Sequence, residues 1–104
     1  MAAAPPFVSY SSACIVDVPA TAWPEVYASL QALKAHVQEY PGCQRFDVFA
    51  ALGDSGARIH VYTTWDSPEQ LEVYLVRGYT FERMLDDIGV DIGVDRSGPM
   101  EKIF

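Results

Sequence analysis

The clearest pattern of apolar positions along the chain predicts a helix over residues 23–40. Seven apolar or aromatic residues recur there three or four positions apart and form a single stripe: Trp23, Val26, Tyr27, Leu30, Leu33, Val37 and Tyr40. Pro41-Gly42 follows at once. Proline cannot donate a backbone hydrogen bond and glycine tolerates the left-handed conformation of a helix cap, so we expect the helix to end there.

The pattern then changes to strict alternation, which predicts two strands over 44–52 and 58–65. In the first strand, one face carries Phe46, Val48, Ala50 and Leu52; in the second, one face carries Ile59, Val61, Thr63 and Trp65. Gly53-Asp54-Ser55-Gly56 lies between the two segments and has the composition of a hairpin turn. The sequence therefore predicts an antiparallel hairpin whose second strand ends on a tryptophan.

Capping signals predict two further helices after this hairpin. Asp66-Ser67-Pro68 combines short polar N-cap residues with proline at the first helical position, which indicates a helix over 68–76. Thr80 is a candidate N-cap for a shorter helix that ends at Gly89.

The ends of the chain complete the domain. We expect a first strand over 7–18, with apolar residues on both faces, and a last strand over 99–104. Residues 1–6 have the composition of a loose tail, so that 7–104 form a single domain. The repeat D-I-G-V-D-I-G-V-D over 87–95 spaces its aspartates four apart, unlike an EF-hand loop, and reads as a solvated linker with small apolar anchors.

The order β-α-β-β-α-(α)-β predicts an α+β fold of the ferredoxin-like type, a four-stranded antiparallel sheet with its helices on one face. The opposite face would carry Phe49, His60 and Tyr62. Because that would leave an exposed apolar patch, we expect a second copy of the chain to cover it by sheet-on-sheet packing.

Composition excludes several classes of protein. The formal net charge of −7, with the basic residues dispersed, argues against nucleic acids and anionic membranes as partners. No apolar run is long enough to span a membrane, and the first residues lack the charged region of a signal peptide, so a cytoplasmic location is expected. Cys14 and Cys43 are expected to be reduced thiols, because two cysteines do not make a disulfide framework in a chain of this kind.

The sequence also resembles the antibiotic biosynthesis monooxygenase family of dimeric α/β barrels. The residues that carry the resemblance are Pro41-Gly42-Cys43 with Phe46-Asp47-Val48, Thr64-Trp65-Asp66, and the helix start Pro68-Glu69-Gln70-Leu71-Glu72. The resemblance runs from the first strand to about Ile88. It implies a homodimer and a cavity between the sheet and the helices.

The activities in this superfamily leave three readings open. The first is a cofactor-independent monooxygenase acting on a flat aromatic, quinol or polyketide-like substrate. The second is a polyketide cyclase-type enzyme, and the third is a ligand-binding or interaction dimer without catalysis. Heme-degrading and anthrone-oxidising relatives use an asparagine; this chain contains none, so their catalytic residues do not carry over.

The candidate site residues follow from strand parity and from the resemblance. Trp65 would stack on a planar substrate, and Thr63 and Val61 share its strand face. Tyr74 and Tyr79 stand near the positions where many relatives carry histidines, and are the candidate catalytic residues. No phosphate-binding loop and no metal-ligand spacing is present, so neither a cofactor nor a metal is expected.

Overall fold

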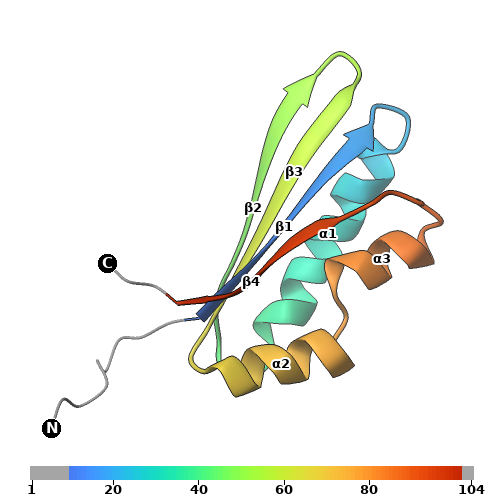
Figure 1. Cartoon of the computed structure of the whole chain (residues 1–104). Helices are drawn as coiled ribbons and strands as arrows, with labels where there is room; N and C mark the ends of the chain where they lie inside the picture. Colours follow the sequence, from blue (N-terminus) through green and yellow to red (C-terminus); the bar gives the residue numbers. More distant parts are fainter. Residues whose placement is uncertain (1–9, 102–104) are drawn as a thin grey trace, which may run out of the picture.

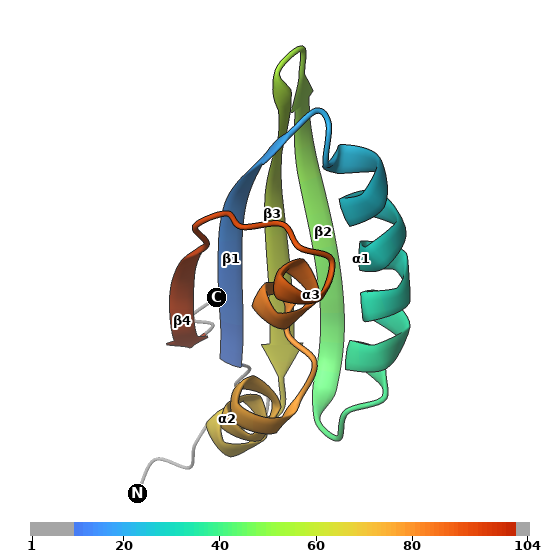
Figure 2. The same ribbon diagram turned by 90° about the vertical axis from the view of Figure 1, so that its right-hand side faces the viewer.

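The computed structural model describes residues 10–101, which form one antiparallel sheet with helices on one of its faces (Figures 1 and 2). The elements are β1 (Tyr10–Pro19), α1 (Trp23–Gln38), β2 (Cys43–Gly53), β3 (Gly56–Trp65), α2 (Pro68–Arg77), α3 (Phe81–Asp87) and β4 (Asp95–Glu101). The predicted ferredoxin-like α+β fold is therefore confirmed.

The strand order is β2-β3-β1-β4, and all three neighbouring pairs are antiparallel. The register pairs Ser12 with Thr63 and Cys14 with Val61 across β1 and β3. Because β3 separates β1 from β2, the strands that carry Cys14 and Cys43 are not neighbours, and both thiols are free.

The predicted helix starts are confirmed in detail. The side chain of Ser67 accepts a hydrogen bond from the backbone N–H of Gln70, and Pro68 follows as the first residue of α2. The side chain of Thr80 accepts from the N–H of Arg83 in the same way at the start of α3. Each hydroxyl satisfies one of the backbone donors that a helix leaves without a partner in its first turn.

The other predicted boundaries agree to within a few residues. The hairpin turn is confirmed, with Gly53 paired to Gly56 across it. The long helix ends at Gln38 rather than at 40, and the chain then turns through Gly42 at a φ of 85°. That left-handed φ is the reason a glycine stands there.

The predicted start of the last strand is wrong, because β4 begins at Asp95 and not at residue 99. Gly98-Pro99 reads as a strand breaker in the sequence, yet β4 is an edge strand, where such residues are tolerated. Its pairing with β1 shifts register between Ser11 and Ala13. Gly98 sits at this irregularity with a φ of 135°, a conformation that L side chains rarely adopt.

Some expectations concern residues outside 10–101. The tail over 1–6, the first residues of the predicted strand over 7–18, and residues 102–104 of the last predicted strand lie outside the described part of the chain.

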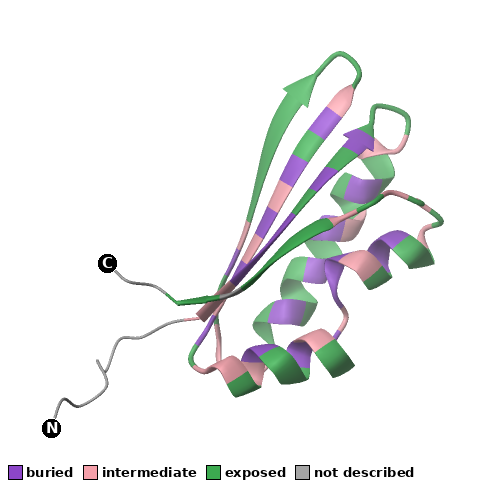
Figure 3. Cartoon of the chain, in the orientation of Figure 1, coloured by how far each residue is buried: buried purple, intermediate pink, exposed green. Residues whose placement is uncertain are grey.

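The core lies between the sheet and the helices (Figure 3). Inward positions of β3 alternate with exposed or partly exposed ones, and so do those of β1 from Cys14 to Val18. The segment from 88 to 94 alternates too: Ile88, Val90, Ile92 and Val94 pack against the core, while the aspartates of the repeat are exposed. The repeat thus forms a strap between α3 and β4 with small apolar anchors.

Candidate functional site

Three of the predicted site residues lie together on the helix-facing side of β3. Val61, Thr63 and Trp65 are all buried, and Trp65 is 0% exposed. They alternate along the strand, so their side chains point to the same face. The parity read from the sequence therefore places them correctly relative to one another.

Trp65 stacks on an aromatic ring supplied by α2. The ring centroids of Trp65 and Tyr74 are 5.0 Å apart, with an angle of 28° between the ring planes. This is a stacked arrangement, in the range of separations that aromatic pairs prefer. One face of the Trp65 indole is thus covered by a planar aromatic group that belongs to a short neighbouring helix.

A short chain of buried hydroxyls holds Trp65 in place. The Trp65 Nε1–H donates to Thr63 Oγ1 at 2.9 Å, and Thr63 Oγ1 lies 2.7 Å from Ser12 Oγ on β1. A buried indole N–H and a buried threonine would each cost stability if they were left without partners. These bonds fix the orientation of the indole against the sheet. We call Ser12, Thr63, Trp65 and Tyr74 the interior cluster.

Tyr74 lies in this cluster but is poorly suited to act as a base. Its hydroxyl donates to the backbone oxygen of Tyr79 at 3.0 Å. Burial raises the pKa of the Tyr74 phenol above its ordinary value of 10.0, and the positive charge of Arg96 opposes that rise. Tyr74 therefore stays protonated at neutral pH and can serve only as a hydrogen-bond donor or a stacking surface.

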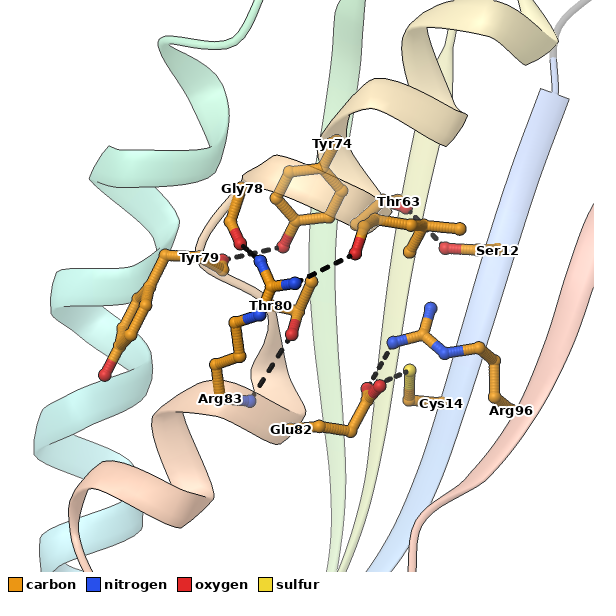
Figure 4. A network of polar contacts seen from close by, with 11 residues as sticks. Ser12, Cys14, Thr63, Tyr74, Gly78, Tyr79, Thr80, Glu82, Arg83 and Arg96 are labelled. Atoms are coloured by element: carbon orange, nitrogen blue, oxygen red, sulfur yellow. Dashed lines mark hydrogen bonds and ion pairs between the residues drawn. The ribbon is translucent and has the colours of Figure 1, made fainter.

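The structure does not bring the ring of Tyr79 to the same place. Figure 4 shows this ring pointing away from Tyr74. It meets the His36 ring edge-on, with the centroids 5.7 Å apart, and its hydroxyl donates to Asp87 Oδ2 at 2.5 Å. That hydrogen bond raises the pKa of the Tyr79 phenol. The backbone carbonyl of Tyr79 contacts the interior cluster through the hydrogen bond from Tyr74.

A second polar group borders the interior cluster, and sequence reasoning missed it. Glu82 on α3 and Arg96 on β4 form an ion pair, and the thiol of Cys14 on β1 donates to Glu82 Oε1 at 3.5 Å (Figure 4). We call Cys14, Glu82 and Arg96 the edge cluster.

The exposed fraction of the side chains in the edge cluster increases from the buried Cys14 to Arg96 and Glu82. Cys14 is 4% exposed, and burial raises the pKa of its thiol to about 12. The side chains of Arg96 and Glu82 are 28% and 38% exposed. The thiol is therefore inert at neutral pH, while the ion pair stands where the interior meets solvent.

The sequence carried a partial signal for these residues. Ser12 and Cys14 stand on the inward face of β1 together with the apolar Val16 and Val18, and polar groups at such positions need partners. Glu82 and Arg96 are separated along the chain by the strap, whose path no local pattern predicts. Their proximity becomes visible only in the folded chain.

Two surface hollows of residues 10–101 lie elsewhere. One of about 550 Å³ borders the turn between β2 and β3, and one of about 480 Å³ lies between α1 and β2, with Trp23 and Tyr27 in its lining. The face of Trp65 is instead occupied by Tyr74. Trp65 and Tyr74 are both buried, so the interior cluster is closed in this conformation, and the expected cavity is not open beside Trp65.

Residues 10–101 show neither a metal-binding cluster nor a membrane-spanning helix. Among residues 10–101, no group of three or more His, Cys, Asp or Glu side chains is arranged to hold a metal ion. Of the helices in this part of the chain, none is long and apolar enough to cross a membrane.

The comparisons with solved structures agree on the fold. The chain resembles a putative antibiotic biosynthesis monooxygenase from Nitrosomonas europaea, with a TM-score of 0.70 and 14% identity over 90% of this chain and 88% of that one. A putative antibiotic biosynthesis monooxygenase from Deinococcus radiodurans gives 0.67 and 15% over 91% and 96%. A variant of SnoaB, a cofactor-independent oxygenase from Streptomyces nogalater, gives 0.63 and 12% over 86% and 88%.

At these identities the likeness establishes the fold. The fold is that of proteins described as antibiotic biosynthesis monooxygenases, so the resemblance stated from the sequence is confirmed at this level. No family model and no curated protein matches the sequence.

Proposed function

We propose that the protein is a cofactor-independent monooxygenase acting on a flat aromatic, quinol or polyketide-like substrate that binds against Trp65. The observation that carries the proposal is the stack of Tyr74 on Trp65. The space on this face of the indole accepts a planar aromatic ring, and Tyr74 marks where a substrate ring would lie.

The surroundings of that space suit such a substrate. Val61, on the same strand face as Trp65, is apolar and buried, and the hydroxyls of Ser12, Thr63 and Tyr74 supply polar groups. A planar apolar ligand with one or two oxygens matches this lining better than a sugar or a phosphate does. The fold shared with a cofactor-independent oxygenase supports the same class of reaction.

Binding requires Tyr74 to leave the face of Trp65. Tyr74 belongs to α2, a helix that ends at Arg77 and is followed by Gly78. A displacement of α2 would open the site, and the Tyr74 hydroxyl could then donate to a substrate oxygen instead of the Tyr79 carbonyl. The part of Tyr79 near the site would be this backbone carbonyl, because the ring of Tyr79 packs against His36.

The chemistry in this proposal belongs mainly to the substrate. Loss of a proton to water gives an electron-rich anion, which passes an electron to O₂; the two radicals combine, a proton returns from water, and loss of water from the resulting hydroperoxide leaves a carbonyl. A CH₂ group and O₂ thus become C=O and H₂O. The protein contributes position, a dry environment and hydrogen bonds to the developing charge.

We propose in addition that two copies of the chain pack through the outer faces of their sheets. Phe49 is 60% exposed on that face and contacts Tyr62 edge-on at a centroid distance of 5.9 Å, while His60 stacks on Tyr62. Exposed aromatic clusters of this kind mark interaction surfaces. A second sheet would cover the patch.

Oxygen uptake tests the proposed activity. Anthrone, a flat tricyclic ketone with a reactive CH₂ group, should be oxidised with one O₂ consumed per molecule, faster than without protein. Trp65→Leu keeps much of the apolar volume and removes the stacking surface, and it should lower the rate at least about tenfold. Trp23→Leu on α1 is the matched control and should leave the rate unchanged.

Two results would favour the alternatives. Conversion of a linear polyketide analogue without O₂ uptake would support a cyclase. Tight binding of flat aromatics with no turnover of any of them would support a ligand-binding dimer.

A further inference from the structure

The function proposed above does not use the edge cluster, but the position of this cluster beside the Trp65 site indicates a role in ligand binding. It lies one step along the sheet from the interior cluster, because Cys14 follows Ser12 on the same face of β1. Cys14 pairs with Val61 of β3 on one side and with Arg96 of β4 on the other. Arg96 therefore lies beside Cys14 on β4, and Cys14 in turn lies beside Val61 of the Trp65 site.

Electrostatics connects the two clusters. The charges of Arg96 and Glu82 both act on the buried phenol of Tyr74, Arg96 stabilising its ionised form and Glu82 opposing it. A ligand oxygen in the place of the Tyr74 hydroxyl would experience the same positive charge. In a chain with a formal net charge of −7, an anionic ligand needs such a local cation to bind.

The guanidinium of Arg96 has further N–H donors besides the one that binds Glu82. Within residues 10–101, its side chain makes a hydrogen bond through Nη2 to Glu82. An arginine side chain carries five N–H donors in a planar fork that fits carboxylate and phenolate oxygens. Glu82 is 38% exposed and can turn to solvent at little cost if another anion replaces it.

We propose that Arg96 binds an ionised oxygen of the ligand in exchange for Glu82, so that the site selects flat aromatic molecules that carry an acidic group. The acidic group is a phenol, an enol or a carboxylic acid. The inference rests on the proposed binding site at Trp65, and it assigns Arg96 as the specificity-determining residue and Glu82 as its competitor.

The test compares two probes of nearly the same shape, one charged and one neutral. The chain has two tryptophans, so a Trp23→Phe background leaves Trp65 as the single fluorophore of this type. Anthraquinone-2-carboxylate is ionised at neutral pH, and anthraquinone-2-carboxamide is neutral. Quenching of Trp65 fluorescence reports binding, and the carboxylate should bind about tenfold more tightly because its hydrogen bonds to Arg96 are charge-assisted.

Variants of the ion pair sharpen the comparison. Arg96→Gln should remove the preference for the carboxylate and leave carboxamide binding within about twofold, since only the charged contact is lost. Glu82→Gln should tighten carboxylate binding, because the competing anion is gone. Arg58→Gln is the matched control, since it removes one positive charge and an exposed ion pair with Asp17, away from the site.

A neutral pair guards against loss of folding. If Arg96→Gln lowers the thermal midpoint, the double variant Glu82→Gln/Arg96→Gln replaces it, since it leaves no charge uncompensated near Cys14. Equal affinity of the parent protein for both probes would overturn the inference and leave the binding site standing. A preference that survives in the Arg96 variants would also overturn it. If neither probe quenches Trp65, both the site and the inference fail.

Discussion

Trp65 is held in place by the stacked ring of Tyr74 and by a chain of hydrogen bonds through Thr63 to Ser12. Its N–H reaches Thr63, which reaches Ser12, so the indole is linked to two strands. Such support is what a ligand-binding surface requires, because a stacking group must keep its orientation when the ligand arrives. Binding of a flat aromatic ligand, rather than a change in stability, is the measurement that assigns a binding role to Trp65.

Cys14 leads to a prediction about pH. Burial raises the pKa of its thiol from an ordinary value of 9.0 to about 12, so the unfolded chain releases this proton at a lower pH than the native chain does. The contribution of the protonated Cys14 thiol to the free energy of unfolding is therefore fully present below pH 9.0 and is lost as the pH rises toward 12.

Urea unfolding at a series of alkaline pH values measures this effect. Cys14→Ala should flatten the decline of the free energy of unfolding with pH. Cys43→Ala is the comparison variant and should flatten it less, because Cys43 is only partly buried. Equal slopes for the parent protein and Cys14→Ala would show that the thiol ionises normally in the native state.

At the level of the elements, β4 depends on one glycine. Gly98 has a φ of 135°, and a Cβ at this position would meet the backbone of Ser11 and Ser12 at 3.0 Å. Gly98→Ala should lower the free energy of unfolding by about 1–3 kcal/mol, through the strained conformation and the close contacts.

Gly93 in the strap provides the control. No atom lies within 4 Å of a Cβ built there, so Gly93→Ala should change stability by less than about 0.5 kcal/mol. Thermal or urea unfolding of the two variants gives the comparison. If both alanines prove equally harmless, the bulge in β4 and its register against β1 would be wrong.

The elements also show where sequence reasoning succeeds and where it stops. Local signals, such as the caps at Ser67 and Thr80 and the alternation over 58–65, predict their elements because each depends on neighbouring residues. The start of β4 was missed because a bulge accommodates Gly98 in an edge strand, and that depends on β1. The edge cluster was missed for the same reason, since its members meet only through the packing of α3 and β4 on β1.

The prediction of site residues succeeded where it depended on neighbouring residues of one strand and was less accurate where it depended on the packing of a helix. Parity along one strand placed Val61, Thr63 and Trp65 on a common buried face. Tyr74 and Tyr79 were taken from approximate positions in helices of relatives, and a helical residue's direction depends on how its helix is docked. Consequently Tyr74 reaches Trp65, whereas the ring of Tyr79 turns toward His36.

For the whole molecule, the outer face of the sheet predicts a dimer. Phe49→Asp would place a charge in the proposed interface, and burying an unpaired charge is costly, so the dimer should dissociate while the fold is kept. Light scattering at micromolar concentration should report twice the chain mass of 11.5 kDa for the parent protein and 11.5 kDa for the variant.

Val76→Asp is the control for this experiment. Val76 is an exposed apolar residue on α2, away from the outer face of the sheet, so the same new charge there should leave the dimer intact. A parent protein that is monomeric at this concentration would show that the apolar face stays uncovered. Dissociation caused by Val76→Asp as well would point to an interface on the helix side.

The central claim is that a flat aromatic molecule binds against Trp65, and a crystal structure of the complex with anthraquinone tests it most directly. Anthraquinone is the expected product from anthrone and does not react further. We predict that its rings stack on Trp65, that Tyr74 moves off the indole together with α2, and that a quinone oxygen accepts a hydrogen bond from the Tyr74 hydroxyl. Anthraquinone bound between α1 and β2, beside Trp23 and Tyr27, with Tyr74 still stacked on Trp65, would contradict the claim.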